Sequence, residues 1–130
     1  MNLVSVLIID DEEDICFLLG NVLRSKKYEV TIANTLTEGL SLIRKVSPSL
    51  LFLDVRLPDG SGLDSIGDIR KQNPEMKIVT MSAYDDMNTR RKAIESGADL
   101  FIGKPLNMEL IDLTLKALQN NQPKKLKQDG

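Results

Sequence analysis

The segment LLFLDVRLPDG, residues 50–60, is the most informative stretch for the fold, because an apolar run of strand length ends abruptly in a carboxylate, a proline and a glycine. A uniformly apolar run such as Leu50 to Leu53 is typical of a strand in a parallel sheet that is covered on both faces. Asp54 then places a charge directly at the end of this buried segment. The rest of the sequence shows which architecture requires a carboxylate there.

The composition is that of one globular domain. The chain has 130 residues, of which 42% are hydrophobic and 28% are charged, and a chain of this length buries roughly two-thirds of its unfolded surface. No apolar stretch approaches the roughly 18 residues that a membrane span requires. The first residues, MNLVSVLIIDDEED, lack the basic region and the cleavage site of a secretory signal. We therefore expect a cytoplasmic protein.

Rare and missing residue types exclude several functions. The sequence has no histidine, which excludes histidine acid–base catalysis, histidine metal ligation and a role as a phosphohistidine carrier. Cys16 is the only cysteine and lies in an apolar helical pattern, so we expect it to be a packing residue. The net charge of −2 offers no basic surface for nucleic acid. We expect no direct binding to nucleic acid and none to membranes.

Strand and helix patterns alternate along the chain. Apolar or period-two runs predict strands over residues 4–9, 28–33, 50–53, 76–81 and 98–102. Apolar residues at helical spacing predict five helices between and after them, at Ile15, Leu18, Leu19 and Val22; Leu36, Leu40 and Ile43; Leu63, Ile66 and Ile69; Met87 and Ile94; and Leu110, Ile111, Leu115 and Leu118. The short connections predict an α/β fold with a doubly wound parallel sheet, flavodoxin-like (βα)5, in the strand order 2-1-3-4-5.

Polar residues at the predicted helix ends support this assignment. Asn34 or Thr35 can cap the second helix, and Asp85 or Asp86 can open the fourth. Gly97 stands where a left-handed residue would end the fourth helix.

Charged and polar side chains follow the strands next to the point where the strand order reverses. Asp10 and Asp11 follow the first strand, Asp54 the third, Ser82 the fourth and Lys104 the fifth. In such sheets, ligands bind at the carboxyl ends of the strands at this switch point. The second strand would be an edge strand far from the crevice, and nothing comparable follows it. Asp54 therefore ends a strand because this edge is where the architecture carries its chemistry.

Each of these residues also has a structural explanation when it is taken alone. Asp10 and Asp11 can cap the first helix, and Asp54 can begin a turn. Ser82 can be another helix cap, and Lys104 can be a surface lysine before a proline. Their joint occurrence at one edge of one sheet favours a functional site.

Three converging carboxylates require a counter-ion. Two carboxylates about 4 Å apart repel by roughly 4 kcal/mol at an effective dielectric constant near 20. Oxygen ligands without histidine or thiolate favour Mg²⁺, or Mn²⁺, over zinc. Lys104 adds a positive charge and Ser82 a neutral donor. This combination suits a phosphoryl group with a carboxylate as its acceptor.

Four segments resemble the receiver domain of bacterial two-component response regulators, namely LIIDDEED, LLFLDVRLPDGSGLD, IVTMSAYDD and DLFIGKPLN. The resemblance covers residues 1–120 and leaves residues 121–130 as a tail or linker. It implies that Asp54 accepts a phosphoryl group from a sensor histidine kinase, a histidine phosphotransfer protein or a small phosphodonor. The protein would then be a phosphorelay switch and not an enzyme, apart from its own Mg²⁺-dependent phosphorylation and dephosphorylation.

The resemblance also implies a metal site and two residues beside it. Asp11 and Asp54 would ligate Mg²⁺ directly, Asp10 would act through water, and Arg56 would contribute its backbone carbonyl. Arg56 and Tyr84 occupy positions that in this family modulate how quickly the phosphoryl group is lost. We expect both side chains to flank the site and to influence the attacking water.

The resemblance further implies a switch. Lys104 would pair with the phosphoryl oxygens, and the peptide bond between Lys104 and Pro105 would be cis. Ser82 would hydrogen-bond the new phosphoryl group, and Phe101 would rotate inward behind it. The fourth helix, the fifth strand and the fifth helix would form the surface for an output partner or effector domain, with a homodimer as a further option.

Three alternatives stay open at this point. An inactive receiver can serve only as an interaction module. A phosphohydrolase of the haloacid-dehalogenase type would need a second acid where Arg56 stands. Flavin or nucleotide binding lacks both a G-x-x-x-x-G-K-[ST] motif and a suitable loop after the first strand. The sequence also leaves open whether this receiver stands alone or is part of a longer protein.

Overall fold

Strands and helices alternate in the computed structural model, which describes residues 4–120. Five strands form one parallel sheet in the order β2-β1-β3-β6-β7, namely β1 (Ser5–Ile9), β2 (Glu29–Ala33), β3 (Leu50–Asp54), β6 (Lys77–Ser82) and β7 (Leu100–Gly103). The helices are α1 (Glu13–Ser25), α2 (Leu36–Val46), α3 (Gly62–Gln72), α4 (Met87–Ser96) and α5 (Met108–Asn120). This order confirms the doubly wound α/β fold predicted from the sequence. The tail expected over residues 121–130 lies outside the described residues.

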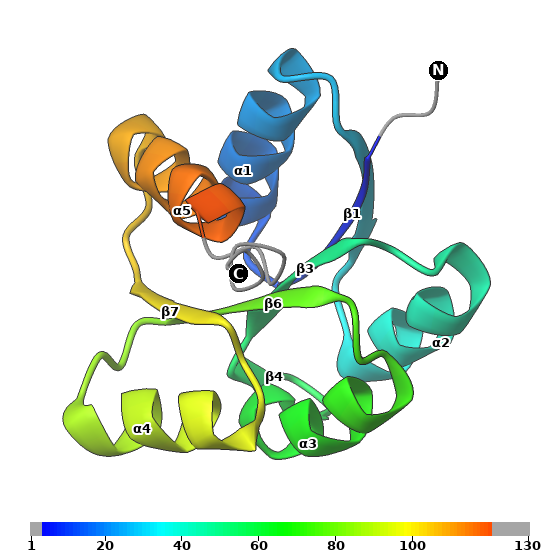
Figure 1. Cartoon of the computed structure of the whole chain (residues 1–130), viewed down its shortest axis with the longest axis vertical. Helices are drawn as coiled ribbons and strands as arrows, with labels where there is room; N and C mark the ends of the chain where they lie inside the picture. Colours follow the sequence, from blue (N-terminus) through cyan, green and yellow to red (C-terminus); the bar gives the residue numbers. More distant parts are fainter. Residues whose placement is uncertain (1–3, 121–130) are drawn as a thin grey trace, which may run out of the picture.

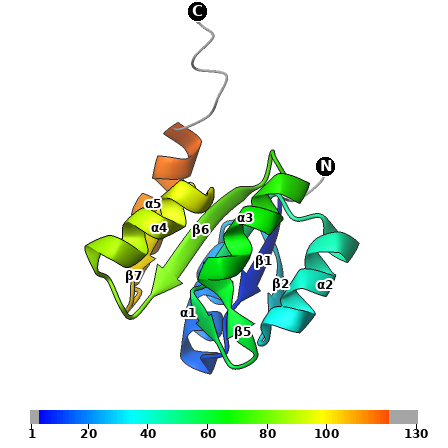
Figure 2. The same ribbon diagram turned by 90° about the horizontal axis from the view of Figure 1, so that it is seen from below.

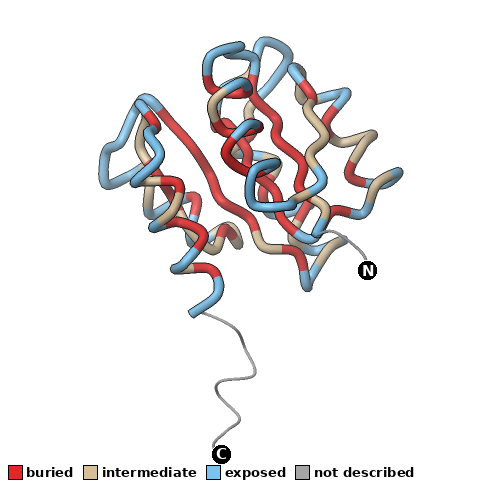
Figure 3. The backbone as a smooth tube through the Cα atoms, turned by 90° about the horizontal axis from the view of Figure 1, so that it is seen from above, coloured by how far each residue is buried: buried red, intermediate tan, exposed pale blue. Residues whose placement is uncertain are grey.

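The helices cover both faces of the sheet. Figure 1 shows α1 and α5 on one face and α2, α3 and α4 on the other. Because side chains alternate between the faces of a strand, each face has its own apolar core. Val6, Ile8 and Phe52 pack toward α1 and α5, whereas Leu7 and Ile9 pack toward the other three helices. All five residues of β3 are buried, and Figure 3 shows such buried segments running along the strands.

The helix ends follow the predicted cap residues. The Thr35 side chain accepts a hydrogen bond from the backbone N–H of Glu38 at 3.1 Å. Asp86 does the same for Thr89 at 2.8 Å, so α4 begins after Asp86. Gly97 ends α4 with a φ of +126°, a conformation that favours glycine.

The fourth helix differs from the sequence prediction in the residues that it buries. The helical pattern predicts Met87 and Ile94 as its apolar positions, but they are 71% and 45% exposed. Ala93 is the buried residue of α4. A small side chain at the contact gives α4 little buried apolar area, so α4 depends on other interactions for its attachment to the sheet.

A small antiparallel hairpin follows β3 and was not predicted. It consists of β4 (Arg56–Leu57) and β5 (Gly60–Ser61), and Figure 2 shows it beside the start of α3. The chain then passes close to Asp54, because the backbone N–H of Gly62 donates to the Val55 carbonyl at 2.9 Å. A Cβ atom at residue 62 would overlap the Asp54 carbonyl, so only glycine fits there.

None of the helices within residues 4–120 is both long and apolar enough to cross a membrane.

Candidate functional site

Three acids converge at the carboxyl end of the parallel sheet. The register pairs Ile9 of β1 with Leu53 of β3, which places the residues that follow them side by side. One carboxylate oxygen each of Asp10, Asp11 and Asp54 lies within 4.8 Å of the other two. Asp10 and Asp54 are buried, whereas Asp11 is exposed. The acidic cluster therefore opens to solvent on the side of Asp11.

Lys104 supplies the positive charge beside this acidic cluster. Its Nζ atom lies 3.0 Å from Asp10 Oδ2 and 3.4 Å from Asp54 Oδ2, and its side chain is only 8% exposed. The backbone N–H of Lys104 donates to the Ser82 carbonyl at 2.8 Å, which fixes this segment to the end of β6. Lys104 is therefore not a surface lysine. The peptide bond between Lys104 and Pro105 is cis.

Glu12 is a third partner of Lys104, and it was not predicted from the sequence. Its Oε1 atom lies 3.0 Å from Lys104 Nζ, although the two residues are 92 positions apart. The Glu12 side chain is 55% exposed. No motif signals this contact, because it depends on the distance between two loops. One ammonium thus faces three carboxylates at this edge.

Asp10 also has a structural role. Its Oδ1 atom accepts a hydrogen bond from the backbone N–H of Glu12 at 2.8 Å, where α1 begins. Its backbone carbonyl accepts bonds from Asn34 Nδ2 at 2.9 Å and from the Cys16 thiol at 3.3 Å. The sequence pattern predicts nothing comparable after the second strand, yet Asn34 holds the backbone of an acidic residue. Cys16 is buried, as expected for a packing residue.

Burial and the charges of neighbouring acids raise the pKa values of the two buried acids. Burial and the charge of Asp10 raise the pKa of Asp54 to about 6, although Lys104 opposes this effect. Burial likewise raises the pKa of Asp10, against the hydrogen bond from the Glu12 backbone and the pull of Lys104. Burial by itself would lower the pKa of Lys104, but its bonds to Asp10 and Glu12 hold that pKa above its usual value. The site therefore carries more negative charge than one lysine compensates.

The acidic cluster fits a divalent cation. Hard carboxylate oxygens without histidine or thiolate are the ligands that Mg²⁺ and Mn²⁺ prefer. A cation at this position would offset the excess negative charge of the cluster. The cluster can thus hold such an ion.

Ser82 lies close to the acids and does not cap a helix. Its neighbour Met81 pairs with Asp54 in the sheet register, which places Ser82 one residue beyond the acid on the adjacent strand. The Ser82 Oγ atom is buried and accepts the backbone N–H of Tyr84 at 2.8 Å. Asp86 caps α4 instead.

Arg56 and Tyr84 meet beside Ser82. The Arg56 guanidinium carbon lies 4.1 Å from the centre of the Tyr84 ring, which is a cation–π contact. A cavity of about 240 Å³ opens there, and Arg56, Ser82 and Tyr84 are among its lining residues. Both side chains therefore lie near the Ser82 hydroxyl, and their influence on an attacking water stays a prediction.

Phe101 is buried in the apolar core on the side of α4, with 6% of its surface exposed. It lies on β7, three residues before Lys104.

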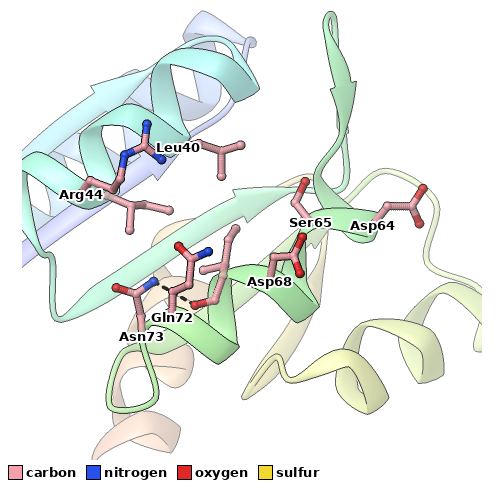
Figure 4. A pocket seen from close by; sticks show the side chains of 9 residues that line it. Leu40, Arg44, Asp64, Ser65, Asp68, Gln72 and Asn73 are labelled. Carbon is pink, nitrogen blue, oxygen red and sulfur yellow. Dashed lines mark hydrogen bonds between the residues drawn. The ribbon is translucent and has the colours of Figure 1, made fainter.

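Another hollow lies between α2 and α3, away from the acidic cluster. Figure 4 shows Leu40 and Arg44 of α2 on one side of it and Asp64 and Asp68 of α3 on the other. Its volume is about 220 Å³. No residue of the acidic cluster lines it, so the chemistry expected from the sequence does not belong to this hollow.

The comparisons with known proteins identify the class. The family model of the response regulator receiver domain matches residues 6–116. The chain therefore belongs to the family of response regulator receiver domains.

Individual relatives agree with this assignment. The chain is 34% identical over 124 residues to the response regulator protein PilR of Pseudomonas aeruginosa, which covers 95% of this chain and 28% of PilR. The chain spans between 25% and 49% of the length of three curated relatives that it matches.

Two solved structures are also similar. A CheY-like receiver domain protein from Methanospirillum hungatei has a TM-score of 0.87 at 31% identity, covering 95% of this chain and 99% of that one. The beryllofluoride-activated NtrC4 receiver domain dimer has a TM-score of 0.82 at 33% identity, covering 88% of this chain and 95% of that one.

Proposed function

We propose that this chain is a phosphoacceptor switch of a two-component phosphorelay and that Asp54 accepts the phosphoryl group. The observation that carries the proposal is the position of the Asp54 carboxylate, which clusters with the carboxylates of Asp10 and Asp11 and lies 3.4 Å from the Lys104 Nζ atom. The proposed receiver domain spans residues 1–120, and residues 121–130 serve as its tail or linker.

The contacts of the three acids favour Asp54 as the acceptor. Both oxygens of Asp10 are engaged, one by the Glu12 backbone at 2.8 Å and one by Lys104 at 3.0 Å. Asp11 is exposed and lacks a buried environment that would orient it. Asp54 is buried, but its two oxygens have only long contacts of 3.4 Å each, to the Arg56 backbone N–H and to Lys104. It is therefore the buried carboxylate with an oxygen available to attack.

The proposed reaction is a transfer between two protein side chains. One oxygen of ionised Asp54 attacks the phosphorus of a phosphohistidine on the sensor kinase or on a histidine phosphotransfer protein. The O–P bond forms while the P–N bond breaks, and the imidazole leaves with the electron pair of that bond. Lys104, whose ammonium already lies between two acids, then pairs with an oxygen of the bound phosphoryl group.

A bound metal ion would offset the negative charge of the phosphoryl group during its transfer. Bound by Asp11 and Asp54, by Asp10 through water and by the Arg56 carbonyl, Mg²⁺ or Mn²⁺ would neutralise the oxygens of the transferred group.

Phosphorylation would alter the partner surface. It adds nearly two negative charges and strong acceptor oxygens next to the Ser82 hydroxyl. The Ser82 hydroxyl then donates a hydrogen bond to a phosphoryl oxygen, and Phe101 occupies its buried position behind it. The face made by α4, β7 and α5 responds and binds an output partner, an effector domain or a second copy.

Intact-mass measurement with acetyl phosphate and Mg²⁺ tests the proposal. The parent gains one phosphoryl group, Asp54→Asn gains none, and Asp68→Asn, which changes an exposed acid of α3, behaves as the parent does. If the Asp54→Asn variant gained a phosphoryl group, the acceptor would be a residue other than Asp54. No modification of the parent by any donor would support an inactive interaction module, and rapid turnover of unrelated phosphate esters would support a hydrolase.

A further inference from the structure

We propose that Arg90 is a positioning residue that holds Phe101 in its buried place and thereby sets the balance of the switch. The inference rests on the proposed function, because it concerns the arrangement that phosphorylation would select. Arg90 lies in α4 and Phe101 on β7. The guanidinium carbon is 4.8 Å from the centre of the Phe101 ring, and Nη1 donates to the Phe101 backbone carbonyl at 3.3 Å.

Arg90 is joined to the loop before its own helix by an ion pair. Its Nη2 atom lies 2.6 Å from Asp85 Oδ1, and Asp85 belongs to the loop between β6 and α4. The same loop contains Tyr84, whose backbone N–H donates to Ser82 Oγ at 2.8 Å. One side chain therefore contacts both the loop that holds the Ser82 hydroxyl and the aromatic residue behind the site.

Asp85 is packed closely against the end of β7. A Cβ atom at Gly103 would come within 2.9 Å of Asp85 Oδ2. Gly103 directly precedes Lys104, whose Nζ atom contacts Asp54 at 3.4 Å. Arg90 therefore contacts Asp85, Asp85 packs against Gly103, and Gly103 is the residue directly before Lys104.

The weak packing of α4 gives these contacts their importance. Ala93 is the buried residue of α4, so little apolar area fixes the helix to the sheet. An element held by few apolar contacts has small free-energy differences between its arrangements. Phe101 is only 6% exposed, and the guanidinium covers its ring. To turn outward, the ring must lose the cation–π contact with Arg90.

The direction of the effect follows from the geometry. Arg90 stabilises the buried position of Phe101, and this is the position that the proposed phosphorylated form requires. Arg90 therefore favours the activated arrangement before phosphorylation occurs. Because the Arg90 and Asp85 side chains are 42% and 46% exposed, solvent screens their ion pair and its contribution is small.

The binding of beryllofluoride, in the presence of Mg²⁺, tests this inference. We expect Arg90→Ala to bind it about two- to fivefold more weakly than the parent, the range for one cation–π contact at a partly exposed site. Arg90→Lys keeps the charge without the planar group and should be intermediate. Arg91→Ala, which removes an exposed neighbouring arginine, should match the parent.

A second measurement examines the ring itself without beryllofluoride. Phe101 and Ala93 belong to the same buried apolar cluster. Magnetisation transfer between the Phe101 ring and the Ala93 methyl group should weaken in Arg90→Ala and stay unchanged in Arg91→Ala. An Arg90 that only stabilised the fold would lower the melting temperature and move neither affinity nor ring position.

The outcomes separate the two proposals. Parent-like or tighter beryllofluoride binding by Arg90→Ala overturns the role of Arg90 and leaves the phosphoacceptor proposal standing. If the parent does not bind beryllofluoride at all, the phosphoacceptor proposal is overturned. The proposed role of Arg90 is then overturned as well, because it rests on the phosphoacceptor proposal. Unchanged magnetisation transfer between the Phe101 ring and the Ala93 methyl group in Arg90→Ala would show that Arg90 does not hold the ring.

Discussion

The Nζ atom of Lys104 lies 3.4 Å from Asp54 Oδ2, although 50 positions separate the two residues in the chain. The same atom lies 3.0 Å from Asp10, so two buried acids share one buried ammonium. Burial disfavours the ionised form of both acids, and a shared lysine compensates them incompletely. The stability of this domain should therefore depend on whether Asp54 is ionised.

Asp54→Asn should stabilise the metal-free protein at neutral pH. The pKa of Asp54 is raised in the folded state from 3.8 to about 6, so folding favours the protonated acid. Its stabilising contribution is complete below pH 3.8 and is lost as the pH rises through about 6. A shift of this size corresponds to about 3 kcal/mol as an upper figure. We expect the free energy of unfolding of Asp54→Asn to exceed that of the parent by up to this amount at pH 7 and by almost nothing near pH 4.

Urea unfolding with a chelator present, between pH 4 and pH 7, measures this difference. Asp68→Asn serves as the control, because Asp68 is exposed on α3 and should show no such pH-dependent gain. A variant at position 54 that is less stable than the parent at pH 7 would contradict the prediction.

Mg²⁺ should raise the melting temperature of the parent. An ion that binds only the folded state at ten times its dissociation constant adds about 1.4 kcal/mol to the free energy of unfolding. Asp11→Asn should shrink this increase, since Asp11 is the exposed member of the cluster and its replacement disturbs little packing. Thermal unfolding across a magnesium titration checks this, with Asp68→Asn as a matched exposed acid. An identical response of parent and Asp11→Asn would remove Asp11 from the site.

Arg56→Ala and Tyr84→Ala should both lose the proposed phosphoryl group faster than the parent. The two side chains stack at 4.1 Å beside Ser82. We expect them to restrict the approach of water from there. If the loss of the Arg56–Tyr84 contact, worth about 0.5–1 kcal/mol, lowers the barrier to hydrolysis by the same amount, the phosphoryl group is lost about two- to fivefold faster. The decay of the phosphorylated species by intact mass measures it. The double variant should decay no faster than either single one, because each replacement already breaks the stack, and parent-like decay in both single variants would refute the idea.

Two helical glycines should respond to alanine in opposite directions. Gly67 of α3 is exposed, and the space that a Cβ atom would occupy there is open, so Gly67→Ala should stabilise the protein by about 0.5–1 kcal/mol. At Gly39 of α2, a Cβ atom would overlap the Ile9 side chain in the core. Gly39→Ala should therefore destabilise the protein by about 1–3 kcal/mol. Urea unfolding of the two variants gives the comparison, and equal effects would show that α2 can move away from β1.

The fold and the composition of the site could be predicted from the amino-acid order alone. Apolar periodicity indicated the five strands of the main sheet and their helices, and the position of each polar residue after its strand indicated the shared edge. This inference works because parallel strands joined by right-handed crossovers bring their carboxyl ends to one edge. Asp10, Asp54 and Lys104 could therefore be assigned together without coordinates. Their chemical roles stay predictions.

How these groups act on one another depends on the packed three-dimensional arrangement. The contact of Glu12 with Lys104 joins residues 92 positions apart, and that of Arg90 with Phe101 crosses from a helix to a strand. The hairpin of β4 and β5 has strands of two residues each, too short for any periodicity. Likewise, the raised pKa of Asp54 depends on burial and on the distances to its neighbours. Periodicity encodes which face of an element is covered, whereas pairing and proton affinity depend on separations of a few ångströms that only packing sets.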